Sequence, residues 1–583
     1  MVRPVVICRG DANGVPSAIA KAIQGEIVMA RGDNVVPALQ TAFSAGRPIV
    51  TNYAAPIVIR ALAPLLQGKF DDPPVVVTSY DAAFVVPILG LSHGARKLAK
   101  TISDDLSKTL VTFGGTTSYF TAGNALDDAP NGYLLSNHRD YKDFAVAVLD
   151  GAPVHIEGHA PWLSGLPQSI SARLKITITE KDIPGSAEHL VYIPQTLAVG
   201  IGCERGCPKE EIEGLIDDVI AKHNLHRSAI AYYTTLDLKE DEDGLRSMFD
   251  LSDSLRLFSA RELQAQMHRV PNPSEVVRAE VGVASVAEAA ALAAAGPDAE
   301  LIVTKVKSKR ATCAIARSPF PLIEKVGRPV GNLTVVGLGP GAEGMRSPEA
   351  SFALWYATDW VGYGLYLDLV ADLKQDQSEH RFPLGGEEER VRHAINLAKD
   401  GKQVALVCSG DAGIYAMAAL VYEIIDLEPC RIEVTVIPGI SAFQAAAAKA
   451  GAMIGHDFCC ISLSDLLTPW EVIERRVKAA AEGDFVISFY NPRSLKRRDQ
   501  LERAFAILAQ HRPPETPVVI ASNLGRPEEK VRIVPFRDFN PNDVDMLTLV
   551  MVGSSQSRSF VRGDGRTFAY TPRGYARKRE AAE

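Results

Sequence analysis

The sequence contains few cysteines and no long apolar run. Its eight cysteines are scattered over 583 residues without a regular spacing, which favours reduced thiols over a disulfide framework. Cys203 and Cys207 form a C-x3-C pair, but no further ligands stand in register to complete a metal site. No stretch reaches the roughly 18 apolar residues that a membrane span needs, and the N-terminus becomes polar too early for a signal peptide. These features predict a cytoplasmic protein without a metal.

Positive charge is in deficit as well. The formal net charge is −8, whereas general nucleic-acid binding requires clustered lysine and arginine. The sequence therefore predicts that neither nucleic acid nor a membrane is a partner, and any basic contact with an anionic ligand must be local. Hydrophobic residues make up 46% and charged residues 23%, which is ordinary globular composition.

Strands that alternate with helical patterns predict a multidomain α/β protein. The length suggests about three to five domains. Proline and glycine concentrate at residues 319–332, which predicts a linker. We expect three smaller α/β or α+β modules at residues 1–120, 121–190 and 191–318, an α/β domain at 333–560 and a loose, basic tail at 561–583.

The domain at 333–560 carries four motifs in which a strand leads through a loop into a helix. The segment LTVVGLGPGA (333–342) ends in three spaced glycines, and Ser347 followed by Pro348 predicts a helix start. The other motifs are VALVCSGDAGIYAMAALV (404–421), VTVIPGISAFQAAAAKAG (434–451) and DFVISFYNPRSLKRRDQL (484–501). Loops at the carboxyl ends of strands usually bind ligands in α/β proteins, so the motifs predict a binding site.

The first motif also fits the dinucleotide fingerprint G-x-G-x-x-A, with Ala342 as its last residue. Two features disfavour a nicotinamide site. Pro340 removes an amide donor from the turn, and Asp359 precedes the next strand, whereas a ribose-binding acid should follow it.

In order and spacing, the four motifs resemble the S-adenosylmethionine-dependent methyltransferases that modify uroporphyrinogen and precorrins. The resemblance covers residues 333–556, and SGDAGIYAMA, GYGLY (362–366) and FYNPRS resemble the precorrin-3B C17-methyltransferase subgroup. It implies a C-terminal two-lobed fold, S-adenosylmethionine in the cleft between the lobes, and a homodimer. It further implies C17 methylation of precorrin-3B with ring contraction to precorrin-4 in cobalamin (vitamin B12) biosynthesis.

Carried over position by position, the resemblance implies cofactor contacts from several loops. The glycine-rich loop would lie beside the cleft, the loop around Asp411 against the methionine end of the cofactor, and the strand around Thr548 near the adenosine. The implied cofactor residues are Gly337, Gly339, Pro340, Gly341, Gly410, Asp411, Ile414, Tyr415, Ile440, Ser441, Ile461, Ser464, Leu547, Thr548 and Leu549.

Methyl transfer from a sulfonium requires positioning and exclusion of water rather than a protein nucleophile. Ring contraction also removes a hydroxyl proton, and several side chains remain open as the acid or base: Asp411, Tyr490, His456 and His393. The acetates and propionates of the substrate should pair with cations. For these contacts we expect Arg493, Lys496, Arg497 and Arg346.

The N-terminal half carries a second resemblance, to cobalt-precorrin-5A hydrolase, on residues 56–102, VGIGCERGCPKEEI and TLDLKEDEDGL. Residues 1–120, 121–190 and 191–318 would be its three modules. The family's Gly-Gly-His-x-Gly-x-Asn motif lacks its second glycine and its asparagine here, but His93 is retained as a candidate catalytic residue. Cys203 would need a neighbouring base to act as a nucleophile. Lactone hydrolysis and a role in holding an intermediate both remain open.

Two alternatives accompany the methyltransferase hypothesis. In the first, the substrate is the cobalt-bearing factor III of the anaerobic pathway in place of metal-free precorrin-3B. In the second, the chain is a non-catalytic tetrapyrrole-binding protein, although such a protein would have no need of the glycine-rich, SGDAGIY and PGIS loops together.

Overall fold

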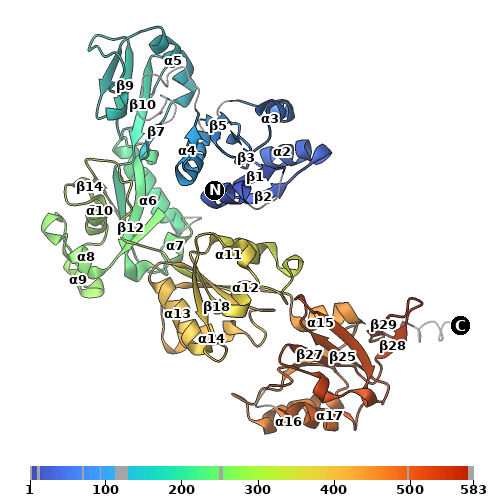
Figure 1. Ribbon diagram of the computed structural model, residues 1–583. Helices are drawn as coiled ribbons and strands as arrows, with labels where there is room; N and C mark the ends of the chain where they lie inside the picture. The colour runs from blue at the N-terminus through green and yellow to red at the C-terminus, as the bar shows by residue number, and fades with distance from the viewer. Residues whose placement is uncertain are drawn as a thin grey trace. The chain divides into compact units, whose positions relative to one another are not determined.

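The computed structural model describes residues 3–9, 14–68, 71–91, 94–111, 126, 129–248, 254–494 and 498–575. The chain divides into two compact units, Met1–Pro329 and Val330–Glu583 (Figure 1). We refer to them as unit 1 and unit 2. No helix of the described residues is both long and apolar enough to cross a membrane.

Unit 1 begins with a six-stranded sheet in the order β2-β1-β3-β4-β5-β6. Alternating residues of its first strand enter different apolar clusters, since Val5 and Ile7 pack on one face and Val6 on the other. The strands are β1 (Val5–Cys8), β2 (Glu26–Met29), β3 (Ile49–Thr51), β4 (Val75–Thr78), β5 (Phe84–Leu89) and β6 (Thr109–Leu110), and the helices α1 (Val15–Ala22), α2 (Val35–Ser44), α3 (Ala55–Leu62) and α4 (Ala95–Leu106).

A four-stranded sheet follows, in the order β7-β10-β9-β8. Its core is built around Phe144, Trp162 and Tyr192. The elements are β7 (Tyr133–Leu135), α5 (Tyr141–Leu149), β8 (Val154–Glu157), β9 (Leu174–Ile178) and β10 (His189–Pro194).

The third sheet of unit 1 has the order β14-β15-β11-β12-β13-β16. Gly200 lies where a helix crosses the sheet, and a Cβ there would be 2.8 Å from the carbonyl carbon of Ala287. The strands are β11 (Leu197–Cys203), β12 (Ile230–Leu236), β13 (Leu255–Phe258), β14 (Glu300–Lys307), β15 (Ala311–Arg317) and β16 (Arg328–Pro329), and the helices α6 (Lys209–Lys222), α7 (Asp243–Arg246), α8 (Ala260–Gln264), α9 (Glu275–Val281) and α10 (Ala287–Ala295).

Part of the expected linker at 319–332 is structured. Arg328 and Pro329 form β16 on the edge of the third sheet, where Arg328 makes two hydrogen bonds of 2.8 Å to the carboxylate of Glu240. This long-range ion pair was not predicted, because the proline and glycine content of the segment conceals it.

Unit 2 consists of two lobes. The first is an all-parallel sheet in the order β19-β18-β20-β17-β21. Its strands are β17 (Asn332–Gly337), β18 (Asp359–Tyr363), β19 (Ser378–Phe382), β20 (Gln403–Cys408) and β21 (Glu433–Ile437), and its helices α11 (Pro348–Tyr356), α12 (Gly364–Asp368), α13 (Glu387–Lys399) and α14 (Met417–Leu427). The predicted helix start is confirmed, since the Ser347 hydroxyl accepts a bond from the Ala350 amide at the N-terminus of α11.

The second lobe has a five-stranded sheet in the order β23-β24-β27-β25-β26 and a small sheet β22-β29-β28. Its elements are α15 (Ala442–Ala450), β22 (Gly451–Ala452), β23 (Phe458–Ser462), α16 (Trp470–Glu482), β24 (Val486–Tyr490), α17 (Gln500–Leu508), β25 (Pro517–Ser522), β26 (Lys530–Pro535), β27 (Thr548–Val552), β28 (Arg558–Val561) and β29 (Thr567–Tyr570).

The tail expected at 561–583 is not loose throughout. Ala569 of β29 is fully buried, and the hydroxyl of Thr571 donates to the Met453 carbonyl at 2.6 Å. The polar and basic composition of this segment obscured a strand of four residues.

Candidate functional site

Three glycines bring the loops at the carboxyl edge of the parallel sheet into direct backbone contact. These loops follow β17, β20 and β21. A Cβ on Gly337 would lie 2.7 Å from the Gly439 nitrogen and 2.9 Å from the Gly410 oxygen. A Cβ on Gly439 would in turn meet the Gly410 carbonyl oxygen. These glycines therefore allow the loops to pack against one another.

Asp411 fixes two of these loops. One carboxylate oxygen accepts the amide of Gly413 at 2.9 Å, and the other accepts the amide of Gly439 at 3.0 Å. Hydrogen bonds to an ionised acceptor are stronger than neutral ones. The carboxylate predicted to act in catalysis thus holds the loop after β20 against the loop after β21, while it still lines the cavity described below.

The glycine-rich loop also contacts the second lobe. A Cβ on Gly341 would lie 2.7 Å from Cγ of Arg526, and a Cβ on Gly525 would lie 2.8 Å from the Ala342 nitrogen. Arg526 donates from Nε to the Pro340 carbonyl at 3.1 Å and from Nη2 to the Ser409 hydroxyl at 2.8 Å. The loop after β25 therefore interlocks with two loops of the first lobe.

Two tyrosines join the lobes near this contact. Tyr415 has a φ of 54°, which is rare for a residue with a side chain. Its hydroxyl donates to the Cys460 carbonyl at 2.9 Å and accepts the Ser462 amide at 3.2 Å. Its ring lies 5.1 Å from that of Tyr490, whose hydroxyl accepts the Phe443 amide. Burial raises the pKa of Tyr490 well above its usual value, so Tyr490 is a hydrogen-bond donor or acceptor and not a base near neutral pH.

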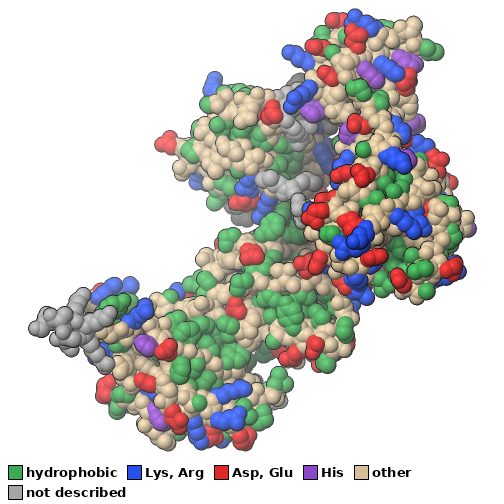
Figure 2. All heavy atoms as spheres, turned by 180° about the vertical axis from the view of Figure 1, so that it is seen from behind, with side chains coloured by type: hydrophobic (Ala, Val, Ile, Leu, Met, Phe, Trp, Pro, Cys, Tyr) green, Lys and Arg blue, Asp and Glu red, His purple; other side chains and the backbone are tan. Residues whose placement is uncertain are grey.

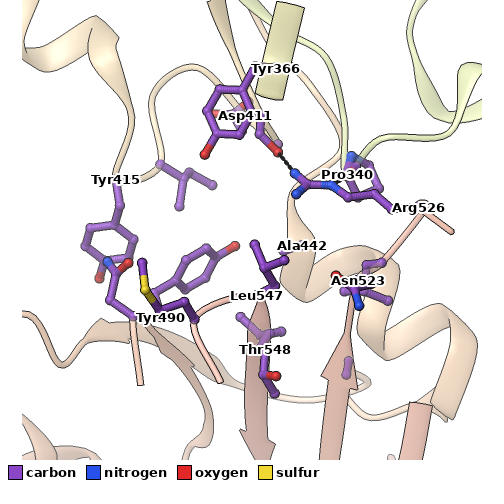
Figure 3. A pocket seen from close by; sticks show the side chains of 18 residues that line it. Pro340, Tyr366, Asp411, Tyr415, Ala442, Tyr490, Asn523, Arg526, Leu547 and Thr548 are labelled. Atoms are coloured by element: carbon purple, nitrogen blue, oxygen red, sulfur yellow. Dashed lines mark hydrogen bonds between the residues drawn. The ribbon is translucent and has the colours of Figure 1, made fainter. Parts of the chain in front are cut away.

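A cavity of about 220 Å³, here called the smaller cavity, lies among these loops (Figure 3). Tyr366, Asp411 and Pro340 lie at one end of it, and Leu547 and Thr548 of the second lobe at the other. Its lining residues are Pro340, Tyr366, Ser409, Gly410, Asp411, Ile414, Tyr415, Ala442, Tyr490, Asn491, Ala521, Asn523, Leu524, Arg526, Met546, Leu547, Thr548 and Leu549.

A second cavity of about 730 Å³, the larger cavity, is lined by both lobes as well. Its lining includes two tyrosines, Tyr363 and Tyr366, apolar residues such as Leu466 and Leu467, and two arginines, Arg476 and the buried Arg390. This volume falls within the usual range for ligand sites, and the mixture of apolar surface with a few charges is typical of them.

The two cavities share a wall. Tyr366, Ser409, Tyr415 and Asn491 line both of them. A group bound in the smaller cavity and a group bound in the larger cavity would meet across these four side chains. The arrangement suits transfer of a small group between two ligands.

The predicted cofactor residues gather around this region. Eight line the smaller cavity: Pro340, Gly410, Asp411, Ile414, Tyr415, Leu547, Thr548 and Leu549. Ile461 and Ser464 line the larger cavity, and Ile440 borders a separate hollow on α15. Ser441 caps α15, and Gly337, Gly339 and Gly341 serve the loop packing, a Cβ on Gly339 meeting the Met345 carbonyl at 2.6 Å.

The predicted substrate-binding and acid–base residues are not gathered at the cavities in the way that the cofactor residues are. Arg346 is almost fully buried in an ion pair of 2.7 Å with Asp372, and Arg493 donates to the Pro541 carbonyl at 2.7 Å. His456 is exposed beside Asp457. None of these three lines either cavity, and their roles in binding substrate or moving a proton stay predictions. His93, Lys496 and Arg497 lie outside the described residues.

His393 belongs to a hydrogen-bonded chain in the first lobe. Its Nε2 lies 2.8 Å from Nδ1 of His380, whose Nε2 lies 2.8 Å from the carboxylate of buried Asp359. Burial, and secondly the nearby His380, lower the pKa of His393. The carboxylate of Asp359 is thus hydrogen-bonded to a histidine.

The arginines that line the cavities were not predicted from the sequence. Arg526, in ASNLGR after β25, and Arg390, on α13, belong to no motif that distinguishes them from surface arginines. Tyr366 lies in the GYGLY run, which supported the resemblance but was given no role. Only their position at the carboxyl edge of each sheet could have singled them out.

In unit 1, Cys203 ends β11 close to several charged side chains. Glu242 is buried, accepts the Gly206 amide at 2.5 Å and lies 3.7 Å from Nζ of Lys239. Burial raises the pKa of the Cys203 thiol to about 12, although Lys239 acts in the opposite direction. A thiol with that pKa is protonated near neutral pH and is a poor nucleophile. No group of three or more potential metal ligands occurs within the described ranges.

Three family models match the sequence. Tetrapyrrole (Corrin/Porphyrin) Methylases matches residues 332–540, Cobalamin synthesis G N-terminal matches 37–116, and Cobalamin synthesis G C-terminus matches 197–316. Among curated relatives, a probable cobalt-factor III C(17)-methyltransferase of Salmonella typhimurium is 46% identical over 243 residues, which are 42% of this chain and 99% of the relative. The chain belongs to the tetrapyrrole methylase family.

Other relatives are of the same kind. The precorrin-3B C(17)-methyltransferase of a Sinorhizobium species is 42% identical over 42% of this chain and 98% of the relative. A crystal structure of the methyltransferase CobJ is 40% identical, covers 42% of this chain and 100% of that chain, and has a TM-score of 0.39. This tetrapyrrole methylase is a methyltransferase, preceded by an N-terminal region of the cobalamin synthesis G type. Both resemblances drawn from the motifs are confirmed.

Proposed function

We propose that unit 2 transfers a methyl group from S-adenosylmethionine to C17 of precorrin-3B, with contraction of the macrocycle to precorrin-4. The observation that carries the proposal is the high identity to two C17-methyltransferases over nearly their whole length. Cobalt-factor III is the second candidate substrate, because one of these relatives is named for it.

The smaller cavity suits S-adenosylmethionine by the chemistry of its lining. Asp411 and Arg526 supply one negative and one positive group for an amino-acid end. Leu547, Leu549 and Ala521 supply apolar surface for an adenine. Asn523 and Thr548 add polar groups that can meet ribose or adenine nitrogens. Bound there, the cofactor would supply a methyl group on a positively charged sulfur.

The larger cavity suits the tetrapyrrole. Tyr363 and Tyr366 offer flat apolar surface to a macrocycle. Arg390 and Arg476 take the place of the arginines expected from sequence as partners for peripheral carboxylates. Glu387 and Glu423, which also line this cavity, would repel carboxylates and so restrict the orientations in which the ring binds.

The protein's part in the transfer is to orient the reactants and exclude water. Tyr366, Ser409, Tyr415 and Asn491 form the wall that both cavities share, so they would border the path of the methyl group. In-line transfer needs the carbon nucleophile roughly 3–3.5 Å from the methyl group. The pair of hydrogen bonds that the Tyr415 hydroxyl makes to the second lobe keeps this wall rigid. For the ring contraction, Asp411 stays the predicted base, although it lines the smaller cavity and not the larger one in which we place the tetrapyrrole.

Unit 1 is the region of the cobalamin synthesis G type, and we propose that it holds a tetrapyrrole intermediate. The protonated state of Cys203 near neutral pH disfavours a cysteine-dependent hydrolase. His93 remains a proposed catalytic residue should hydrolysis occur.

We further propose a cytoplasmic homodimer formed through unit 2. Hydrophobic side chains gather over the face of this unit shown in Figure 2, and its exposed apolar residues include Phe352, Leu427 and Ile440. Exposed apolar surface of this kind usually marks an interface.

The deciding experiment offers the full chain methyl-labelled S-adenosylmethionine with either metal-free precorrin-3B or cobalt-factor III. We expect label at C17 by mass spectrometry and carbon NMR, and a contracted ring with the metal-free substrate. Methylation of the cobalt-bearing substrate alone would assign the anaerobic reaction. No transfer to either would refute the proposed function and leave the tetrapyrrole-binding alternative.

A further inference from the structure

We propose that Arg526 is a positioning residue that joins the two lobes of unit 2 and binds the carboxylate at the methionine end of the cofactor. This inference rests on the proposed function, since it takes S-adenosylmethionine as the occupant of the smaller cavity. It assigns to one side chain both the closure of the site and the recognition of one end of its ligand.

The first part of the proposal, that Arg526 joins the two lobes, follows from its hydrogen bonds. Arg526 follows β25 of the second lobe, yet its Nε and Nη2 donate to Pro340 and Ser409 of the first lobe at 3.1 and 2.8 Å. The turn that carries it is itself fixed, because the Gly525 amide donates to Glu529 at 2.7 Å and Glu529 pairs with Lys449 at 2.6 Å. Arg526 therefore projects from a rigid turn and not from a free loop.

The second part of the proposal, that Arg526 binds a carboxylate, follows from the N–H groups that these two hydrogen bonds leave over. A guanidinium carries five N–H groups, and the two bonds above use one hydrogen each of Nε and Nη2. Within the described part of the chain, no acceptor is bonded to Nη1 of Arg526. The guanidinium lies 5.9 Å from the centre of the Tyr366 ring and lines the smaller cavity (Figure 3). Planar guanidinium groups match carboxylates with two parallel hydrogen bonds.

The charges of the smaller cavity select the carboxylate as the group that Arg526 binds. Among the described residues that line this cavity, Asp411 and Arg526 are the charged ones. An amino-acid end carries one ammonium and one carboxylate, and these two side chains offer one partner to each. The adenosine end has no negative group, and the opposite end of the cavity is lined by apolar Leu547 and Leu549.

The test compares two ligands on three proteins by isothermal titration calorimetry. The ligands are S-adenosylhomocysteine and its decarboxylated analogue, which keeps the amine, the sulfur and the adenosine. The proteins are the full wild-type chain, Arg526→Met and Arg526→Lys. Arg532→Met is the matched control, because Arg532 lies on β26 of the same lobe, pairs with Asp543 at 2.8 Å and lines neither cavity.

We expect the wild-type protein to bind S-adenosylhomocysteine roughly 10- to 100-fold more tightly than the analogue, as a charged hydrogen-bonded pair implies. Arg526→Met should reduce this preference to about twofold or less, and Arg526→Lys should retain part of it through its charge. Arg532→Met should bind both ligands like the wild type.

Loss of affinity for both ligands by the same factor in Arg526→Met would overturn the carboxylate assignment, since a defect in lobe closure alone lowers both equally. An unchanged preference would overturn it too. Wild-type protein that binds neither ligand would instead refute the cofactor in the proposed function, so the two failures are distinguishable.

Discussion

Adding one methyl group at Gly439 should loosen the loops on which the site depends. The Cβ of Gly439→Ala would meet the Gly410 carbonyl oxygen and lie 2.8 Å from both the carbonyl carbon and the oxygen of Gly337. All of these atoms are backbone, so no flexible side chain can move aside. The Gly439 amide also donates to Asp411 at 3.0 Å, and a shift of the loop would lengthen that bond.

We expect the substitution to lower the stability of unit 2 by about 2–3 kcal/mol, since overpacking typically costs about 1–3 kcal/mol and the bond to Asp411 is weakened as well. For a unit of this size the melting temperature should fall by about 4–9 °C. Scanning calorimetry of the full chain measures it, taking the transition that S-adenosylhomocysteine raises as that of unit 2.

Gly344→Ala is the matched control, because a Cβ at Gly344 meets nothing within 4 Å in the same lobe. Its melting temperature should stay within about 1–2 °C of the wild type, as for most open surface positions. If Gly439→Ala were as stable as this control and bound S-adenosylhomocysteine equally well, the loop-packing role assigned to these glycines would be wrong.

Three further predictions concern polar groups that are wholly or partly buried. The fully buried Arg512 side chain donates to backbone carbonyls and pairs with Asp484 at 3.0 Å. Calorimetry of Arg512→Met should therefore show unit 2 destabilised by about 3–5 kcal/mol. A loss of stability below about 1 kcal/mol would contradict this. The pKa of His393 is lowered in the folded protein, so on acidification this histidine is protonated in the unfolded chain at a higher pH than in the folded one. Stability from this group is therefore complete above a pH of about 6.5 and lost below it, and His393→Gln should flatten urea-midpoint profiles there; an unchanged slope would contradict the reasoning. The pKa of Cys203 is raised to about 12, so its rate of reaction with iodoacetamide should increase with each pH unit for as long as the protein stays folded. A rate that levels off near pH 8.5, where an ordinary thiol with a pKa of about 8.5 titrates, would contradict the raised pKa.

The features that could be predicted from the sequence are those that depend on residues close together along the chain. Ser347 and Pro348 start α11, and the loops of the four motifs lie at the carboxyl ends of strands. Each depends on local geometry, such as a capping hydroxyl or a backbone angle that glycine tolerates. The edge of the sheet at which the site lies was therefore predictable from short stretches of sequence.

The partners within the site were not predictable in the same way. Arg526 and Pro340 are separated by 186 positions along the chain, and nothing near either residue indicates the other. Arg346 and Arg493 were predicted to bind substrate because they lie in or beside the motifs, and nothing in those motifs indicates their partners Asp372 and Asn542. Which arginine faces a cavity depends on how strands far apart in sequence pack, and no local pattern encodes that.

The wall of Tyr366, Ser409, Tyr415 and Asn491 has a consequence for inhibitor design. Both cavities border the same four side chains, so, with adenosine in the smaller cavity as proposed, a short tether could join an adenosine fragment to an aromatic fragment. Binding of one fragment would then present the other at a high effective concentration, and the gain disappears if the tether is too short to span the wall. The tether length at which affinity rises would report the distance between the two bound fragments in solution.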